Sequence, residues 1–339
     1  MKDQGFLAIV GASMRCASLA FMSIVLTLLG CGRKEDLSKS NASLNESSVR
    51  EDILSVLDDT PFNAAYQLAC HNCYDSKYWN GTFEEVFDAI QVVEVDIFDT
   101  TLDIFSSGQK HDWYVGHLPV GNDNNCGGSF SSCLEMLSNW MRRNPEHDVV
   151  TFFIDKKQGW GNTRNPEDLD DLLLRYIPRE HIFSPSDLAR QYDNVRTAIK
   201  NKGWPTMGAL KGKVMFAVTG GSGIFSITRN RTLDQYVQQR GKDAVAFVAP
   251  DATSIDHILS VPTAFSEGGR DWVAFFNLKR NQARLGSVAF QQRLVTRIWG
   301  GDKLPFCDLV NRSVNLVALY QFFHREDLGC DEKGVIQPR

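Results

Sequence analysis

Histidine and carboxylate side chains end or interrupt several short apolar runs of the sequence. The run "AAYQLAC" (64–70) is followed by His71 and Asn72, and the run "VVEVDIF" (92–98) contains Glu94 and Asp96. On a strand, Glu94 and Asp96 point to the same face because side chains alternate. Two carboxylates side by side in an apolar segment repel each other unless a cation lies between them. The pair therefore predicts a bound cation.

The groups around this pair would give the cation oxygen ligands only. Asp155 ends a further apolar run, "VVTFFID" (149–155). The predicted metal ligands are Asn72, Glu94, Asp96 and Asp155. Because oxygen-only ligand sets favour hard divalent cations, we expect Ca²⁺ as the cofactor, in preference to Mg²⁺.

Two histidines could transfer protons beside this cation. His71 follows the first apolar run, and His117 ends the run "DWYVGH" (112–117). The pKa of an imidazole lies close to neutral pH, so one ring can act as general base and the other as general acid. A lone histidine is more often structural, but these groups stand together at successive strand ends, which favours a catalytic site.

The elements that must position these residues follow an alternating pattern. Helical patterns at 131–143 and 165–177 lie between apolar runs, and the second opens with Asn165 and Pro166. Nine runs are candidate strands: 64–70, 92–98, 112–117, 149–155, 213–219, 244–249, 271–277, 294–300 and 315–322. Strand–helix alternation predicts a parallel sheet, and such barrels place their reacting groups at the carboxyl ends of strands. We therefore expect an α/β fold, a (β/α)8 TIM-type barrel that is distorted or has one extra strand. A doubly wound open sheet is the alternative, although no GxGxxG motif follows an early strand.

The composition is that of a globular protein. Of 339 residues, 43% are hydrophobic and 23% are charged, and the formal net charge is −5. No basic run with interleaved aromatic residues is present, which argues against nucleic acid as a partner.

The N-terminal segment predicts export. The apolar stretch "CASLAFMSIVLTLLGC" (16–31) is too short for a membrane span of about 20 residues. Its end, Leu28 to Cys31, resembles a bacterial lipoprotein cleavage box, which implies a lipidated Cys31. We predict a lipoprotein signal peptide at 1–30, a flexible polar tether at 31–58 and the barrel at 59–339. The protein would be anchored to a bacterial membrane through Cys31 or, with a plain secretory signal, secreted.

Export makes the remaining cysteines candidates for disulfides. They are Cys70, Cys73, Cys126, Cys133, Cys307 and Cys330. The simplest local pairs are Cys126 with Cys133 and Cys307 with Cys330, but the full connectivity stays open. A zinc site is disfavoured because Cys70-x-x-Cys73 lacks a second pair of ligands.

Longer stretches of the sequence resemble the phosphatidylinositol-specific phospholipase C superfamily, a group of PLC-like phosphodiesterases, and most closely its bacterial calcium-dependent branch. The likeness is carried by "CHNCY", "VVEVDIFD", "GHL", "CLEMLSNWMRRNPEHDVVTFFIDKKQGW", "KGWPTMGALKGKVMFAVTG" and "RLVTRIWGGD". It covers roughly residues 62 to 325. It implies a phosphoric diester hydrolase.

The resemblance also implies roles for individual residues. His71 matches the first catalytic histidine, and either His71 or the metal-bound carboxylate Glu94 would take the hydroxyl proton. His117 matches the general acid for the leaving alkoxide. Lys157 matches a lysine that holds the phosphate, which suits its point charge. Arg297, in "VTRIW", matches an arginine at the edge of the site.

The metal ligands match with one departure. Asn72, Glu94 and Asp96 match the family's ligands. Asp155 stands where the branch usually carries glutamate, so we expect it to reach the ion less tightly or through a water.

The implied reaction is attack of the inositol 2-hydroxyl on the lipid phosphorus, which yields diacylglycerol and an inositol cyclic phosphate. A glycerophosphodiesterase or a sphingomyelinase D-like enzyme is the alternative, because these enzymes share the barrel and the carboxylate and histidine pairs. A non-catalytic lipoprotein that binds phospholipid headgroups is a further alternative, which the intact His71 and His117 disfavour. The expected partner is a phospholipid at a membrane surface, and we expect a monomer.

Overall fold

The computed structural model describes residues 58–99, 111–118, 124–162, 164–220, 229–261, 265–320 and 322. The predicted signal peptide, Cys31, Cys330 and all of the tether before residue 58 lie outside these ranges. In the described part, no helix is both long enough and apolar enough to span a membrane.

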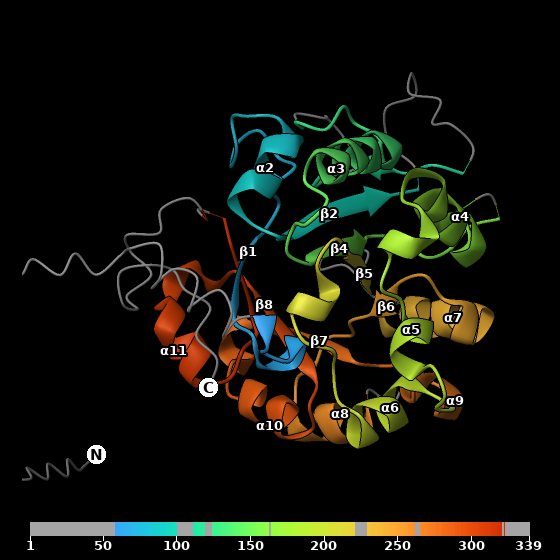
Figure 1. Ribbon diagram of the computed structural model, residues 1–339, viewed down its shortest axis with the longest axis vertical. Coiled ribbons are helices and arrows are strands. Elements are labelled where there is room, and N and C mark those ends of the chain that lie inside the picture. The colour runs from blue at the N-terminus through green and yellow to red at the C-terminus, as the bar shows by residue number, and fades with distance from the viewer. Residues whose placement is uncertain are drawn as a thin grey trace, which may run out of the picture. The chain divides into compact units, whose positions relative to one another are not determined.

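The strands form two sheets that together carry the predicted barrel (Figure 1). They are β1 (Gln67–Cys70), β2 (Val92–Phe98), β3 (Tyr114–Val115), β4 (Val150–Lys156), β5 (Val214–Thr219), β6 (Phe247–Val248), β7 (Phe275–Lys279), β8 (Val295–Trp299) and β9 (Leu316–Leu319). One sheet has the order β3-β2-β4-β5-β6 and the other the order β1-β9-β8-β7. A parallel bridge from Asp251 to Asn277 joins the chain beyond β6 to β7. Each predicted strand is present, and the fold is the predicted TIM-type α/β barrel.

The extra strand of this barrel is β3. It runs antiparallel to β2, whereas the other paired strands run parallel. The run 112–117 therefore does not end a barrel strand, and the expectation that His117 stands at such an end is wrong. His117 reaches the barrel mouth because the Gly116 amide donates to the Asp96 carbonyl at 3.1 Å, which holds the chain beyond β3 against the end of β2.

Helices surround the strands in Figure 1. The α-helices are α2 (Phe83–Ala89), α3 (Phe130–Arg143), α4 (Pro166–Tyr176), α5 (Pro185–Ala189), α6 (Val195–Asn201), α7 (Arg229–Arg240), α8 (Ile255–Ser260), α9 (Glu267–Arg270), α10 (Leu285–Gln291) and α11 (Phe306–Asn311). The 3-10 helices are η1 (Phe62–Ala64), η2 (Arg179–His181), η3 (Gly208–Leu210), η5 (Gly241–Asp243), η6 (Arg280–Gln282) and η7 (Gly301–Lys303). Both predicted helices are confirmed as α3 and α4. The helix α4 starts at the Asn165–Pro166 pair, as predicted, and Asn165 forms a capping box there with Asp168.

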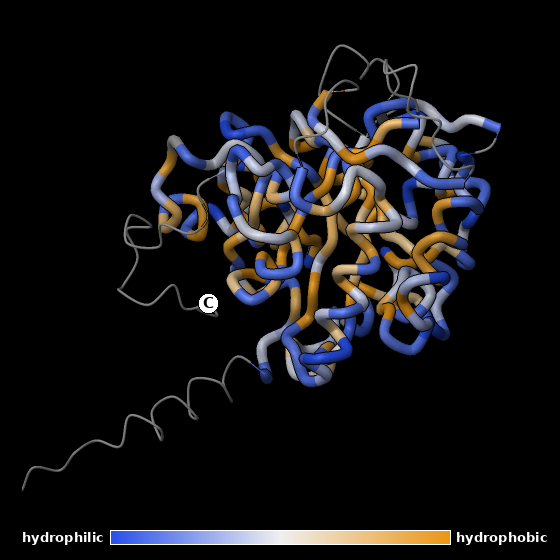
Figure 2. Tube along the Cα trace, turned by 90° about the horizontal axis from the view of Figure 1, so that it is seen from above, coloured by the Kyte–Doolittle hydropathy of each residue, from blue (hydrophilic) through white to orange (hydrophobic). Residues whose placement is uncertain are grey.

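The centre of the barrel is apolar, as the hydropathy colouring of Figure 2 shows along the inner strands. Every residue of β2 and β4 is buried. Neither face of such a strand contacts solvent, so its side chains can all be apolar. This explains the nearly unbroken apolar runs in the sequence. The exceptions, such as Glu94 and Asp96, therefore stand out against an apolar background.

Disulfides join Cys70 to Cys73 and Cys126 to Cys133. The second pair confirms the predicted local pairing. Cys307 is also disulfide-bonded, to a partner outside the described residues. The first pair closes the turn that follows β1, so the cysteines flanking His71 are structural.

Candidate active site

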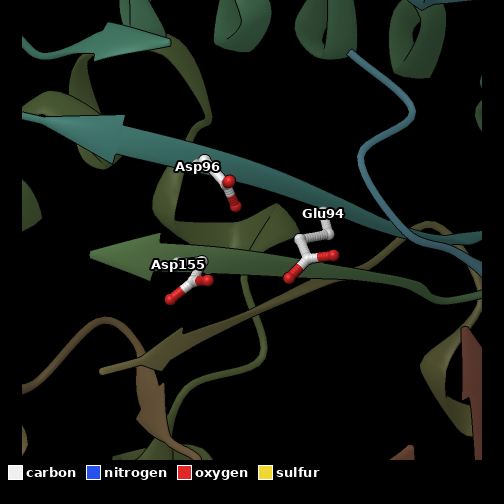
Figure 3. Close-up of side chains that lie close together, drawn as sticks. All are labelled: Glu94, Asp96 and Asp155. Atoms are coloured by element: carbon white, nitrogen blue, oxygen red, sulfur yellow. The ribbon is translucent and has the colours of Figure 1, made fainter. Parts of the chain in front are cut away.

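Three carboxylates meet at the carboxyl ends of β2 and β4. Asp96 lies opposite Asp155 in the parallel register, and Glu94 lies two residues earlier on the same face of β2 (Figure 3). Each offers an oxygen within 4.8 Å of the other two, and all three side chains are buried. Because like charges at this distance repel in a poorly solvated site, cations must hold them together.

Lys157 supplies one of these cations. Its Nζ lies 2.6 Å from Asp155 Oδ2 and 3.0 Å from Asp96 Oδ2. Burial lowers the pKa of Lys157, but Asp155 and Asp96 outweigh burial and raise this pKa above its ordinary value. Burial raises the pKa of Asp96, helped by Asp155 and Glu94 and opposed by Lys157 and His117. Lys157 therefore stays charged, and its charge does not fully offset the carboxylates.

One oxygen of Glu94 is hydrogen-bonded to His71 and forms an ion pair with Arg297. His71 Nδ1 lies 2.5 Å from Glu94 Oε2, and Arg297 Nη2 lies 2.6 Å from the same atom. Burial raises the pKa of Glu94, but Arg297 and then His71 outweigh it and hold this pKa well below its usual range. Glu94 is thus a carboxylate, which must accept the proton of His71 Nδ1. The Nε2 atom of His71 is left free to accept another.

The second histidine stands half exposed above the carboxylates. His117 Nδ1 lies 3.2 Å from Asp96 Oδ2 and 3.2 Å from Asn72 Nδ2. A protonated Nδ1 donates to Asp96, whereas a deprotonated Nδ1 accepts from Asn72, so each contact belongs to a different protonation state. The hydrogen bond to Asp96 raises the pKa of His117, against the effect of its partial burial. A proton on His117 is therefore retained to higher pH than on a free imidazole.

Three buried oxygens at this cluster have no hydrogen-bond partner among the described residues, which fits a cation site. They are Asn72 Oδ1, Asp96 Oδ1 and the Tyr74 hydroxyl, whose pKa is raised by burial and by Asp96. Buried polar atoms are normally satisfied, so orphan oxygens beside carboxylates indicate a missing positive charge. Among the described residues, the three carboxylates face two permanently cationic side chains, Lys157 and Arg297, so one negative charge is left over whenever His117 is neutral. A divalent oxygen-binding ion fits both observations.

Local backbone geometry explains how Asn72 reaches this cluster. Its φ is 58°, in the left-handed region that asparagine tolerates better than most residues. The Cys70–Cys73 disulfide spans this turn, so the covalent link restrains the strained residue. The sequence "CHNC" therefore presents His71 and Asn72 from a fixed turn.

All the predicted site residues lie in this one cluster. Hydrogen bonds, ion pairs or close carboxylate approaches connect His71, Asn72, Glu94, Asp96, His117, Asp155, Lys157 and Arg297. Sequence reasoning missed polar residues at two further strand ends. Thr219 Oγ1 donates to Asp155 Oδ1 at 2.9 Å, and Arg297 Nη1 donates to Asn277 Oδ1 at 3.1 Å. Each stands at the carboxyl end of an apolar run, which is the signal that found the others.

Comparisons with known proteins identify the family. A family model described as phosphoinositide phospholipase C, Ca²⁺-dependent, matches residues 109–251. A solved structure of a calcium-dependent phosphoinositol-specific phospholipase C from a Gram-negative bacterium, Pseudomonas sp., is 33% identical in sequence. The match covers 84% of this chain and 96% of that chain, with a TM-score of 0.74. The chain belongs to the calcium-dependent phosphoinositide phospholipase C family. It is accordingly a phosphoric diester hydrolase.

Other solved structures of such phospholipases agree. The myoinositol complex of the Pseudomonas enzyme is 33% identical, with 84% of this chain and 97% of that chain covered and a TM-score of 0.74. A Ca²⁺-dependent phosphatidylinositol-specific phospholipase C from Streptomyces antibioticus is only 17% identical, yet its TM-score is 0.65 over 79% of this chain and 97% of that chain. The second likeness supports the fold alone. A comparison with curated proteins finds no match.

Proposed function

We propose that this phospholipase C cleaves phosphatidylinositol-type lipids, with calcium, to diacylglycerol and an inositol cyclic phosphate that water can open later. The observation that carries the proposal is the placement of two histidines on the same carboxylate cluster. His71 is bonded to Glu94, and His117 is within hydrogen-bonding distance of Asp96. An acid and a base beside a cationic centre are what in-line displacement at a phosphodiester needs.

His71 is the proposed general base. Its Nδ1 proton is bonded to Glu94, so its Nε2 presents a lone pair to an incoming hydroxyl. As the ring takes the proton of the inositol 2-hydroxyl, Glu94 offsets the positive charge that forms on the imidazole. The hydroxyl oxygen then attacks the adjacent phosphorus, and a five-membered cyclic phosphate forms.

His117 is the proposed general acid. Its pKa is raised chiefly by the hydrogen bond to Asp96, so a larger fraction of it carries a proton near neutral pH. It donates that proton to the diacylglycerol oxygen as the bond from phosphorus to this oxygen breaks. Its half-exposed position gives the lipid's leaving group access to the ring.

The phosphate charge is met by Lys157, Arg297 and calcium. Lys157 is the proposed phosphate-binding cation, because its charge is retained in the buried site. Arg297 is fully buried against Glu94 and Asn277, so its proposed role is to hold Glu94 ionised and oriented, with a weaker effect on the phosphate. Calcium, held by Asn72, Glu94, Asp96 and Asp155, would supply positive charge next to the phosphate oxygens.

Charge balance supports calcium binding before the substrate. With His117 protonated for its role as general acid, the three carboxylates are balanced by Lys157, Arg297 and His117, and the cluster without metal is neutral. A divalent cation would make the cluster positive. An anionic phosphodiester is therefore favoured more strongly after the cation has bound.

A panel of phospholipids tests the proposed substrate. Wild-type protein is incubated with phosphatidylinositol, glycerophosphodiesters and sphingomyelin, and products are identified by mass spectrometry. Diacylglycerol with an inositol phosphate from phosphatidylinositol supports the proposal. Ceramide phosphate, or glycerol phosphate from a glycerophosphodiester, in the absence of phosphatidylinositol cleavage would replace it with the alternative substrates.

We also propose that the enzyme is exported and anchored in a bacterial membrane through Cys31. The lipobox-like end of the N-terminal apolar stretch supports this, together with the disulfides, which form in oxidising compartments. Metabolic labelling with a fatty acid tests it: label should enter the wild-type protein and not the Cys31→Ala variant. Release of unlabelled wild-type protein into the medium would show secretion instead.

A further inference from the structure

Lys156 is a buried lysine beside the active site that the reaction does not use. It stands in β4 between Asp155 and Lys157, so its side chain points to the opposite face of the strand. That side chain is fully buried and pairs with Asp99 Oδ1. Its Nζ also donates to the Gln158 and Gly159 carbonyls at 3.0 and 3.1 Å. These bonds fix the segment that follows Lys157.

The Asp99 carboxylate receives donors from both strands that flank β2. From the β4 side it pairs with Lys156, and from the β3 side it accepts the Trp113 indole N–H at 2.9 Å. The Asp99 amide further donates to Gln158 Oε1 at 2.7 Å. Trp113 is fully buried, immediately before β3. The Asp99 carboxylate therefore links the end of β2, the end of β4 and the start of β3.

Each of these three strands carries, or is directly followed by, a residue of the active site. β4 carries Asp155 and is followed directly by Lys157, and β2 carries Asp96. β3 leads within two residues to His117, whose Nδ1 lies 3.2 Å from Asp96 Oδ2. A shift of β3 against β2 would thus change the position of His117 relative to the phosphate-binding groups.

We propose that Lys156, Asp99 and Trp113 are positioning residues that set the distance between the general acid His117 and the phosphate-binding end of β4. This inference rests on the proposed function. We expect a large effect because a displacement of about 1 Å at a reacting group can lower the rate about 100-fold. The buried ion pair supplies rigidity, because hydrogen-bonded partners satisfy the charge of Lys156 and such satisfied buried networks are rigid. Burial lowers the pKa of Lys156, and Asp99 opposes this.

Two substitutions test separately the contact of Asp99 with Trp113 and its contact with Lys156. Trp113→Phe keeps an aromatic six-membered ring but removes the pyrrole ring with its N–H, and with it the hydrogen bond on the β3 side. Lys156→Met keeps the chain length and removes the cation on the β4 side. The matched control is Lys211→Met, which removes a lysine paired with Asp58 at 2.6 Å in a partly exposed position. Asp99→Asn, of the same size, replaces either variant that does not fold.

The readout is turnover and KM on two substrates that differ in leaving group. One is natural phosphatidylinositol, and the other has a nitrophenol in place of diacylglycerol and needs no proton from His117. For Trp113→Phe we expect kcat on the natural lipid to fall about 10-fold to 100-fold, with KM within about twofold and a much smaller loss on the nitrophenyl substrate. For Lys156→Met we expect both substrates to lose turnover, because Lys157 moves as well. Asp99→Asn, used in place of either variant, should lose turnover on both substrates, and more on the natural lipid.

Several outcomes would overturn the proposal. Folded Trp113→Phe or Asp99→Asn with unchanged kcat would do so, as would equal losses on the two substrates for Trp113→Phe. A loss matched by the Lys211→Met control would show a general effect on stability. If wild-type protein itself leaves both substrates intact while it cleaves another phospholipid, the proposed function fails instead, and the two failures are thereby distinguished.

Discussion

Arg297 is the side chain whose removal should change stability most among the charged residues of the site. It is 1% exposed, Glu94 is 2% exposed, and their charged atoms lie 2.6 Å apart. Arg297→Met keeps an apolar side chain but removes the guanidinium, whose carbon lies 4.8 Å from the centre of the Phe153 ring, and leaves the Glu94 carboxylate paired with His71. Breaking a buried pair by removing one partner costs about 3–5 kcal/mol. At about 2–4 °C per kcal/mol for a domain of this size, the melting temperature should fall by about 6–20 °C.

Thermal and urea unfolding in the presence of chelator measure this cost. The control is Arg143→Met, which removes an exposed arginine paired with Glu84 and should cost about 1 kcal/mol or less. Acidification gives a second check. The folded pKa of Glu94 lies below the value of about 4.3 for an unfolded glutamate, so the stabilisation is complete above about pH 5 and is lost as pH falls further. The difference between wild type and Arg297→Met should therefore shrink in acid. A difference that equals the Arg143 control at neutral pH would refute the account of Glu94.

Three further predictions concern the remaining charged groups. His117→Ala should lower turnover on natural lipid by about 100-fold to 10,000-fold, and a substrate with a nitrophenol leaving group should recover most of this loss. The same substrate should not rescue His71→Ala. Equal rescue of both variants would mean that the general acid is wrongly assigned. Asp96→Asn should weaken calcium binding measured by titration calorimetry at least about tenfold, and unchanged affinity would remove Asp96 from the ligand set. Burial raises the pKa of Asp170 to about 6, although the hydrogen bonds of Tyr236 and Arg240 oppose this shift. The free energy of unfolding of wild type should therefore fall by up to about 3 kcal/mol relative to Asp170→Asn as pH rises from about 4 to 7. A pH-independent difference in urea unfolding would contradict that burial effect.

The fold and the site could be predicted from the sequence where the evidence was local. Apolar runs such as "VVTFFID" mark strands because both faces of β4 are buried, and the residue at each run's end marks the barrel mouth. Glu94 and Asp96 are conspicuous because an ionisable pair inside such a run has no solvent to face. The cap at Asn165 and Pro166 is equally local, and it located α4 correctly.

What escaped prediction depends on contacts between distant parts of the chain. Arg297 was placed at the site's edge, but it lies fully buried on Glu94, an ion pair across 203 residues of sequence that no pattern reveals. His117 follows an antiparallel strand, and it reaches the mouth through the pairing of β3 with β2 and the hydrogen bond of Gly116 to the Asp96 carbonyl. Thr219 also ends an apolar run, but its bond to Asp155 depends on the register of β4 against β5.

The central claim is that a calcium-dependent two-histidine site cleaves phosphatidylinositol through a cyclic phosphate. Phosphorus NMR of wild-type enzyme with phosphatidylinositol, first with calcium and then with excess chelator, tests it most directly. With calcium, we expect the resonance of a five-membered cyclic inositol phosphate to appear before any acyclic inositol phosphate. With chelator, we expect the lipid resonance to persist. Acyclic phosphate as the first product, or equal cleavage in chelator, would contradict the account.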